Sequence, residues 1–230
     1  MKLIVAKNIT SSIITALESH GFDLVFTKEN TNLLPGLTMH PDMQAAKVGN
    51  TLICDKALYG YYMDALSESG CTVVCGETKC RCNYPEDVAY NVKVMGDYVF
   101  HNFKHTDKKL LEYIEYKNKL DVNQGYSGCS ICNVCENALI TADTGIDRTA
   151  KKAGISSLLI SPGHIALEGF DYGFIGGASF EYDGKVYFFG DVTCHPDYKK
   201  IKDFITLNNK EIVCLTKEYL TDYGSAIAFD

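Results

Sequence analysis

A thiol, two imidazoles and a set of polar side chains are the residues of this sequence that could carry out covalent chemistry together. Cys129 offers a sulfur nucleophile, which a nearby base would activate. His40 and His164 are the two histidines considered as its acid–base partner. The side chains expected to bind a substrate are Asp42, Glu86, Asp87, Asn91 and Ser179.

Most of these residues lie in or just before a short sequence pattern, the repeated phrase, which occurs four times in the chain. Each copy is a short apolar run, a two-residue turn and a second apolar run, as in VGNTLICD and YDGKVYFFGD. Turns of this kind between apolar runs predict β-hairpins. Counted back from the turn, Asp42, Cys129 and Gly176 share one offset, and Asp87 aligns with His40. Equivalent backbone positions therefore carry different chemistry.

Each hairpin is followed by a helical pattern and then by a short apolar run. The predicted helices are 57–69, 107–119, 146–153 and 196–207, and the predicted strands after them are 71–75, 120–122, 156–161 and 211–216. The N-terminus repeats only part of this unit, with a strand at 3–6, a helix at 10–21 and a strand at 22–26. Its missing first strand is predicted in the tail, 224–230, where side chains alternate.

Pairing the tail with the first strand would close five units into a ring. A closed ring leaves no sheet edge exposed, and the sequence has no low-complexity linker that would divide residues 1–230 into two domains. The competing interpretation is an open α/β sheet whose hairpins are similar by chance. We favour the ring, because the four hairpins agree in turn position and in the helical and apolar segments after the turn. The first strand of each unit then lies near the axis, and residues at its start face a common pocket.

Five strand–strand–helix–strand units about a pseudo-fivefold axis resemble the pentein fold of the guanidino-group-modifying superfamily. HPD, at His40–Asp42, resembles the His-x-Asp of that family, and GYSGCSIC, around Cys129, resembles its Gly-Gly-x-x-Cys. IGGASFEYDG resembles its Glu-Gly-Gly-Asp strand and hairpin, although Ile175 and Ala178 replace the two acidic residues. The chain also resembles a compact bacterial branch of this fold. As architecture, the resemblance covers essentially the whole chain.

The resemblance implies a small guanidino or amino-acid-like compound bound at the axis. It also implies a cysteine-dependent amidinohydrolase or amidinotransferase in which the Cys129 thiolate attacks the guanidinium carbon. His40 or His164 would protonate the departing amine and then activate water. The two missing acidic residues leave a second hypothesis open, a catalytically silent pentein that binds a small molecule or a protein.

Each candidate residue also has a purely structural interpretation. Cys129 could be a small buried hydrophobic residue, as cysteines often are. His40, before a proline, could cap a loop, and His164 follows the end of a predicted strand. The acidic candidates could be turn or surface residues; Asp87 is the best placed of them, because Asn91 lies four residues further along before the same hairpin.

Metal binding is the third hypothesis, raised by the cysteine-rich segments CTVVCGETKCRC and CSICNVC. Cys-x-x-Cys spacing is typical of zinc and iron–sulfur sites. On a strand, however, Cys129 and Cys135 face one way and Cys132 the other, so one ion would not collect all three. Cys80 and Cys82, in a predicted loop, remain the better chelating pair. We expect neither a metal site nor a cofactor.

Composition and charge narrow the class of partner. The net charge of −7 and the absence of a basic cluster argue against nucleic acid and are compatible with a cationic small molecule. The chain has no predicted signal peptide or membrane span, so we expect a cytoplasmic protein whose ten cysteines are reduced. The oligomeric state stays open.

Overall fold

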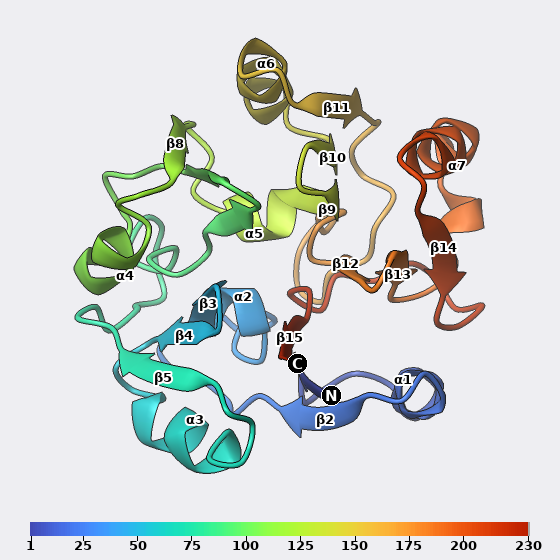
Figure 1. The fold of residues 1–230 in the computed structure, drawn as a ribbon. Helices are drawn as coiled ribbons and strands as arrows, with labels where there is room; N and C mark the ends of the chain where they lie inside the picture. The colour runs from blue at the N-terminus through green and yellow to red at the C-terminus, as the bar shows by residue number, and fades with distance from the viewer. Residues whose placement is uncertain (230) are drawn as a thin grey trace.

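The computed structural model describes residues 1–229, which form a ring of five three-stranded sheets around a central axis (Figure 1). Every sheet has the same plan. A middle strand pairs antiparallel with an inner strand on one side and parallel with an outer strand on the other. The ring predicted from the repeated phrase is therefore confirmed.

The inner strands surround the axis and the outer strands lie toward the rim. The inner strands are β15 (Ile227–Phe229), β3 (Ala45–Val48), β6 (Lys93–Met95), β9 (Ile131–Cys135) and β12 (Ser179–Tyr182). The middle strands are β1 (Lys2–Val5), β4 (Thr51–Cys54), β7 (Tyr98–His101), β10 (Ala138–Thr141) and β13 (Lys185–Phe188). The outer strands are β2 (Asp23–Phe26), β5 (Thr72–Cys75), β8 (Asn118–Asp121), β11 (Ser156–Leu159) and β14 (Glu211–Cys214). We number the units in this order, from the β15–β1–β2 unit to the β12–β13–β14 unit.

One helix per unit joins the middle strand to the outer strand and lies at the rim of the ring (Figure 1). These helices are α1 (Ser11–Ser19), α3 (Tyr59–Ala65), α4 (Lys108–Tyr113), α6 (Thr144–Lys152) and α7 (Tyr198–Leu207). Three shorter helical turns are α2 (Pro41–Gln44), α5 (Ser127–Ser130) and η1 (Val192–Cys194). Two of these, α2 and α5, stand directly before the inner strands β3 and β9.

An aspartate after the middle strand begins the turn toward the rim helix in several units. Asp143 follows β10 and accepts hydrogen bonds from the backbone N–H groups of Gly145 and Ile146. Asp55, after β4, accepts the N–H of Ala57 in the turn before α3, although α3 itself has no side-chain cap. A side chain that satisfies free N–H groups at a helix start is a capping interaction. The Asp that ends the repeated phrase therefore has a local structural role.

The predicted helix 107–119 is longer than the observed one. The structure ends α4 at Tyr113 and begins β8 at Asn118, two residues earlier than the predicted strand 120–122. The pairing register explains the earlier start of β8. The strand pairs in parallel with all four residues of β7, beginning with Tyr98 opposite Asn118. The polar residues of β8 carry no apolar run, so the pairing partner decides the boundary rather than the local pattern.

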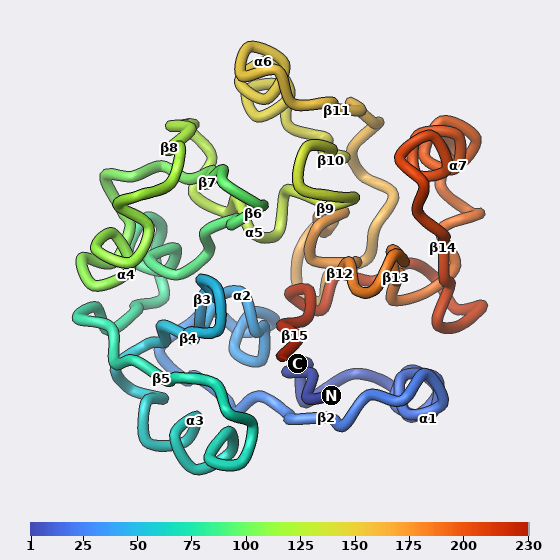
Figure 2. The backbone as a smooth tube through the Cα atoms, viewed as in Figure 1, coloured from blue at the N-terminus to red at the C-terminus, as the bar shows by residue number. Residues whose placement is uncertain are grey.

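The tail closes the ring as the sequence predicted. Strand β15 pairs antiparallel with β1, with Phe229 opposite Lys2 and Ile227 opposite Ile4. Figure 2 shows the two ends of the chain side by side near the axis, which the pairing explains. Asp230, the last residue of the predicted tail strand, lies outside the described residues. The first unit is thus assembled from the two ends of the chain.

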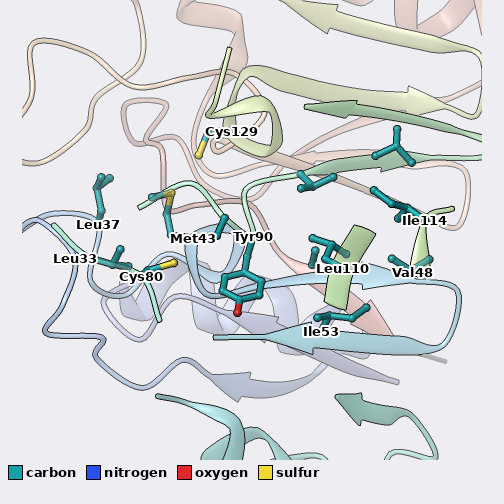
Figure 3. Close-up of a cluster of buried hydrophobic side chains, with 14 residues drawn as sticks. Leu33, Leu37, Met43, Val48, Ile53, Cys80, Tyr90, Leu110, Ile114 and Cys129 are labelled. Atoms are coloured by element: carbon teal, nitrogen blue, oxygen red, sulfur yellow. The ribbon is translucent and has the colours of Figure 1, made fainter. Parts of the chain in front are cut away.

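The apolar core consists of five clusters, and each lies between two neighbouring units. The cluster between the second and third units joins Val48 and Ile53 to Val99, Leu110 and Ile114 (Figure 3). The other four interfaces have their own clusters of buried side chains. Each unit therefore packs on both of its neighbours. The described part of the chain contains no helix long and apolar enough to cross a membrane.

Truncation of Phe229 tests ring closure. Its side chain is 1% exposed and packs with Ile4 and Leu52 in the cluster between the first and second units. Phe229→Ala should lower the free energy of unfolding by about 3–5 kcal/mol, because it removes apolar burial and leaves a cavity at the closing strand. Urea denaturation followed by circular dichroism measures the change.

Leu207→Ala is the matched control, because Leu207 is 79% exposed at the end of α7. It should change the free energy of unfolding by less than about 0.5 kcal/mol. Equal effects of the two substitutions would contradict a role for β15 in holding the ring closed.

Candidate functional site

Cys129 lies in α5, in the turn just before the inner strand β9, and its side chain is buried at 3% exposure. Its Sγ is 3.0 Å from Asp42 Oδ2, to which the thiol donates, and Asn91 Nδ2 donates to the same sulfur over 3.0 Å. Figure 3 shows the sulfur at the edge of the cluster between the second and third units, beside Met43. Three different units therefore meet at one thiol.

Asn91 is the residue that holds these units together. Its Nδ2 also donates to the Asp42 carbonyl over 3.2 Å, and its Oδ1 accepts the backbone N–H of Cys129 over 3.2 Å. Its own carbonyl accepts the N–H of Gly128. A Cβ on Gly128 would lie 3.0 Å from Asn91 Oδ1, so this close approach favours glycine at 128. The amide thus orients both Cys129 and Asp42.

Asp222 is a second buried carboxyl group at this place, and it comes from the segment that leads into β15. Its Oδ2 accepts the N–H of Phe174 and its Oδ1 accepts the N–H of Gly224, both over 2.9 Å. A Cβ on Gly177 would lie only 1.9 Å from Asp222 Oδ1. Gly177, in the segment that resembles Glu-Gly-Gly-Asp, is therefore needed to admit the carboxyl group of another unit.

His40 contacts Asp222. Its Nδ1 lies 3.8 Å from Asp222 Oδ1 and makes no hydrogen bond to any described residue. Burial lowers the pKa of the imidazole to about 3, so near neutral pH the two groups are not an ion pair, although they are close enough for one. The His40 side chain packs directly on Gly224, which has φ +75° and no room for a Cβ. Backbone conformation and packing thus both require glycine at 224.

A cavity of about 270 Å³ opens beside the thiol. Cys129 and Asp222 contribute polar groups to its wall, and the remaining wall is mostly apolar and aromatic. The other lining residues are Leu37, Met43, Tyr126, Leu167, Phe170, Asp171, Tyr172 and Phe174. Half of the wall comes from the long loop between β11 and β12, where Phe170 and Tyr172 are exposed. Neither lysine nor arginine is among these lining residues.

Burial raises the pKa of the three acidic groups that meet here, and repulsion from neighbouring acidic groups adds to the effect for Asp222 and Cys129. Burial raises the pKa of Asp42 to about 6, against the opposing hydrogen bond from Cys129 and the charge of Lys93. Burial and the neighbouring Asp42 raise the pKa of Asp222 to about 7. Burial and both carboxyl groups raise the pKa of the Cys129 thiol well above its ordinary value. The site is a cluster of buried acids that the charge of Lys93 compensates only in part.

The structure brings together some of the predicted site residues. Cys129, Asp42 and Asn91 form one hydrogen-bonded cluster, and His40 lies against Asp222. Asp87, predicted to face the same pocket, is buried and accepts a 2.6 Å hydrogen bond from Tyr126, which lines the cavity. The Asp87 side chain therefore supports the cavity wall from behind.

Three other predicted residues lie elsewhere. Glu86 is exposed and pairs with Arg81, so it does not face the axis. Ser179 is buried, and its hydroxyl donates to the Ile175 carbonyl. His164 is exposed, packs its ring on His195 and does not line the cavity. Neither Ser179 nor His164 has a described contact with the thiol, and none of the three residues lines the Cys129 cavity.

Sequence reasoning missed Asp222, although a signal for it is present. Asp222 stands five residues before β15, as His40 stands five residues before β3. Assigning the tail strand to the first unit makes the residues before it equivalent to those before the other inner strands, and Asp222 is among them. The aromatic loop 161–175 was also missed, because it has no periodic pattern.

The cysteine-rich segments do not assemble a metal site in the described part of the chain. No group of three or more His, Cys, Asp or Glu side chains there is arranged to hold an ion. Cys80 is buried, whereas Cys82 is exposed. All ten cysteines are free thiols.

Substitution of Asp42 tests the electrostatic strain. In the unfolded chain the carboxyl ionises near pH 3.8, whereas its folded pKa is about 6, so its burial weakens the fold progressively as pH rises from about 4 to about 6. Asp42→Asn should therefore gain stability relative to wild type across this interval, by up to about 3 kcal/mol. Urea midpoints measured at several pH values give the difference.

Asp203→Asn, at an exposed position on α7, is the control and should show no such pH-dependent gain. If Asp42→Asn gains the same stability at pH 4 and pH 7, ionisation of the Asp42 carboxyl group does not destabilise the folded protein.

Comparison with solved structures identifies the fold. The chain matches an amidinotransferase of the saxitoxin biosynthetic pathway from Microseira wollei with a TM-score of 0.63, at 11% identity, over 100% of this chain and 94% of that chain. It matches the dimethylarginine dimethylaminohydrolase of Pseudomonas aeruginosa, in a mutant complexed with citrulline, with a TM-score of 0.56, at 10% identity, over 94% and 92%. The agmatine deiminase of C. jejuni gives 0.56, at 10% identity, over 94% and 87%.

These likenesses establish the fold and leave the chemistry open, because the identities are so low. No curated protein matches the sequence. A family model does match, over residues 4–227, and its description is Family of unknown function (DUF6873). The chain therefore has the pentein fold, shared with guanidino-modifying enzymes, and belongs to the family of unknown function DUF6873.

Proposed function

We propose that the protein binds a small guanidino compound in the Cys129 cavity and that Cys129 attacks its central carbon. The observation that carries this proposal is the thiol itself, which lies with two buried carboxyl groups, Asp42 and Asp222, and has no cationic side chain in the lining of its cavity. A bound cation would compensate the negative charge that the two carboxyl groups carry when ionised, and it would favour ionisation of the thiol. The reaction class is amidinohydrolase or amidinotransferase.

The residues that line the cavity favour binding of a planar cation over binding of other ligands. Tyr126 and Phe174 stack with their ring planes 24° apart, and both line the cavity. Aromatic faces attract guanidinium groups, and carboxylates bind them through paired hydrogen bonds. An amino-acid-like ligand would need a partner for its own carboxylate, and the lining residues offer no lysine or arginine for that purpose. A guanidino compound without a carboxylate therefore fits better.

A balanced reaction can be built from the observed contacts. The Cys129 thiol passes its proton to Asp42, which accepts its hydrogen bond, and the sulfur forms a bond to the guanidinium carbon. The bond from that carbon to the departing nitrogen then breaks, and the amine leaves with the proton held by Asp42. Water adds to the carbon and expels the sulfur; one of its protons returns to the sulfur, the other passes to Asp222, and a ureido product is left. In a transferase, an amine replaces the water.

Asp222 contributes to this proposal as a proton carrier, and His40 packs behind it. Asp222 lines the cavity, whereas His40 does not and lies 3.8 Å from the carboxyl group without a hydrogen bond to it. With a pKa of about 7, Asp222 changes its protonation near neutral pH, which suits a group that activates water. His40 is then a positioning residue rather than a catalytic one.

The fold likeness supports the ligand class only at a coarse level. One similar structure is a dimethylarginine dimethylaminohydrolase with bound citrulline, and another is an agmatine deiminase with its substrate bound. Both are penteins that act on guanidino compounds. Their identity to this chain is 10% and 12%, so the residues that bind ligand here are argued from this cavity alone.

A catalytically silent binding protein is the second candidate, and one observation favours it. The Cys129 thiol is hydrogen bonded to a carboxyl group rather than to an imidazole, and its pKa is raised instead of lowered. An unactivated thiol suits a structural role. Mass spectrometry of guanidino compounds incubated with the protein separates the two, since only the enzyme forms a ureido or transferred product.

Labelling with a small amidine electrophile tests the reactive site. A haloacetamidine should alkylate Cys129 selectively, because its cation is drawn to Asp42 and Asp222, whereas neutral iodoacetamide should prefer the exposed Cys82 and Cys194. Asp222→Asn should slow the amidine reaction about tenfold or more, since a hydrogen bond to a charged group is worth about 1.5–3 kcal/mol. Peptide mass spectrometry locates and quantifies the adducts.

Asp203→Asn, far along the rim on α7, controls for the general loss of a negative charge and should leave the rate unchanged. If the amidine labels Cys82 and Cys194 as fast as Cys129, or if Asp222→Asn has no effect, the proposed cation site is wrong.

The pH dependence of binding is a separate prediction. Asp42 and Asp222 ionise with pKa values of about 6 and about 7, so affinity for a permanent cation such as methylguanidinium should rise between pH 5 and pH 8. Calorimetry on the Cys129→Ser variant measures this without chemistry. An affinity that stays flat over this interval would exclude these two carboxyl groups from the binding site.

A further inference from the structure

We infer that a second ligand site lies at the other end of the propeller axis and takes a small carboxylate at Lys93. A cavity of about 360 Å³ opens there. Its wall receives residues from every unit of the ring, among them Lys47, Lys93, Asn133, Glu181 and Ala228. The inner strands of the five units surround the axis (Figure 2), and residues of all five units line this cavity.

The two cavities share no lining residue. The Cys129 cavity is built from segments that precede the inner strands, whereas the second cavity is built mainly from β3, β6, β12 and β15 themselves. Asp42 and Gly128 line the second cavity, while their neighbours Met43 and Cys129 line the first. The hydrogen bond from Cys129 to Asp42 therefore belongs to the partition between the two cavities.

The charged side chains around the second cavity differ in their partners. Asp42 accepts a hydrogen bond from the Cys129 thiol through Oδ2, whereas its Oδ1 is buried and has no hydrogen-bond partner among the described residues. Asp183, in the turn after β12, is exposed to solvent. Lys47 donates to the Ala228 carbonyl and lies over the Phe229 ring, and Glu181 is bridged by Lys210 over 2.9 Å. Lys47 and Glu181 thus have partners within the protein.

Lys93 is the exception. Its ammonium group has neither a hydrogen bond nor an ion-pair partner among the described residues, and burial lowers its pKa. The carboxyl groups that act on it, Asp42 and Glu181, lie beyond contact distance or are already bridged. The Lys93 side chain is half-buried in the cavity wall, so its ammonium group is left to water or to a bound anion, and a carboxylate in the cavity would pair with it.

Asn133 adds a second polar feature to the same wall. Its Oδ1 is buried and makes no hydrogen bond to a described residue, so it can accept one from a ligand. Phe180 and the alanines of β3 and β15 make the remaining wall apolar. The matching ligand is a small carboxylate with a hydroxyl or amine donor near the carboxyl group. Its carboxylate would bind Lys93, and its donor would bind Asn133.

Protection of Lys93 from amine modification tests this site in the full chain. Formaldehyde with a borane reductant is small and neutral enough to enter the cavity and methylates lysine amines. Glycolate, used as the probe, should slow methylation of Lys93 about tenfold or more, which corresponds to about 1.4 kcal/mol. Glycolamide, which has the same shape without the charge, should not slow it. Exposed Lys119, on β8, should react equally in all samples.

Thermal unfolding gives an independent measurement. Glycolate should raise the Tm of wild type and of Lys119→Met, because it binds the folded state, and should not raise that of Lys93→Met. Equal protection by glycolate and glycolamide, or an equal rise in Tm for both variants, would overturn the proposal. If Lys93→Met does not fold, the protection measurement alone decides. Neither measurement uses Cys129 chemistry, so failure of the proposed reaction would not affect this result.

Discussion

Closure of the ring by β15 is the constraint on which the rest of the structure depends. The apolar core is divided among five interfaces between neighbouring units, and the last interface forms only when the two ends of the chain pair. The same closure brings Asp222 to the axis, because Asp222 precedes β15. Stability and the candidate site thus rest on one antiparallel pairing of three residue pairs.

The axis concentrates polar groups that a core would normally exclude. Asp42, Asp222 and the Cys129 thiol are buried together, and burial raises the pKa of each. Such clusters weaken a fold unless a ligand compensates them, and they are common at functional sites. Asn91, which bonds to both Asp42 and Cys129, keeps the strained groups in place.

Much of the fold could be predicted from the sequence because the repeated unit is local. Two-residue turns such as Gly49–Asn50 and Asp183–Gly184 specify hairpins wherever they occur, and the alternation of the tail specifies β15. Part of the site could be predicted from the same repeat, since Asp42 and Cys129 share one offset and meet through a hydrogen bond. Glu86 shows the limit of this reasoning, because its neighbour Asp87 turns inward while Glu86 faces solvent.

The sequence by itself determined the units, their order and the tail strand that closes them, because turns, periodicity and alternation are short-range properties. Only the tertiary structure decided which side chains meet. Asp222 joins the site across the closed ring, Gly177 makes room for it from another unit, and His164 packs on His195 instead of the thiol. These outcomes depend on the three-dimensional packing of segments distant in sequence, which no local pattern encodes.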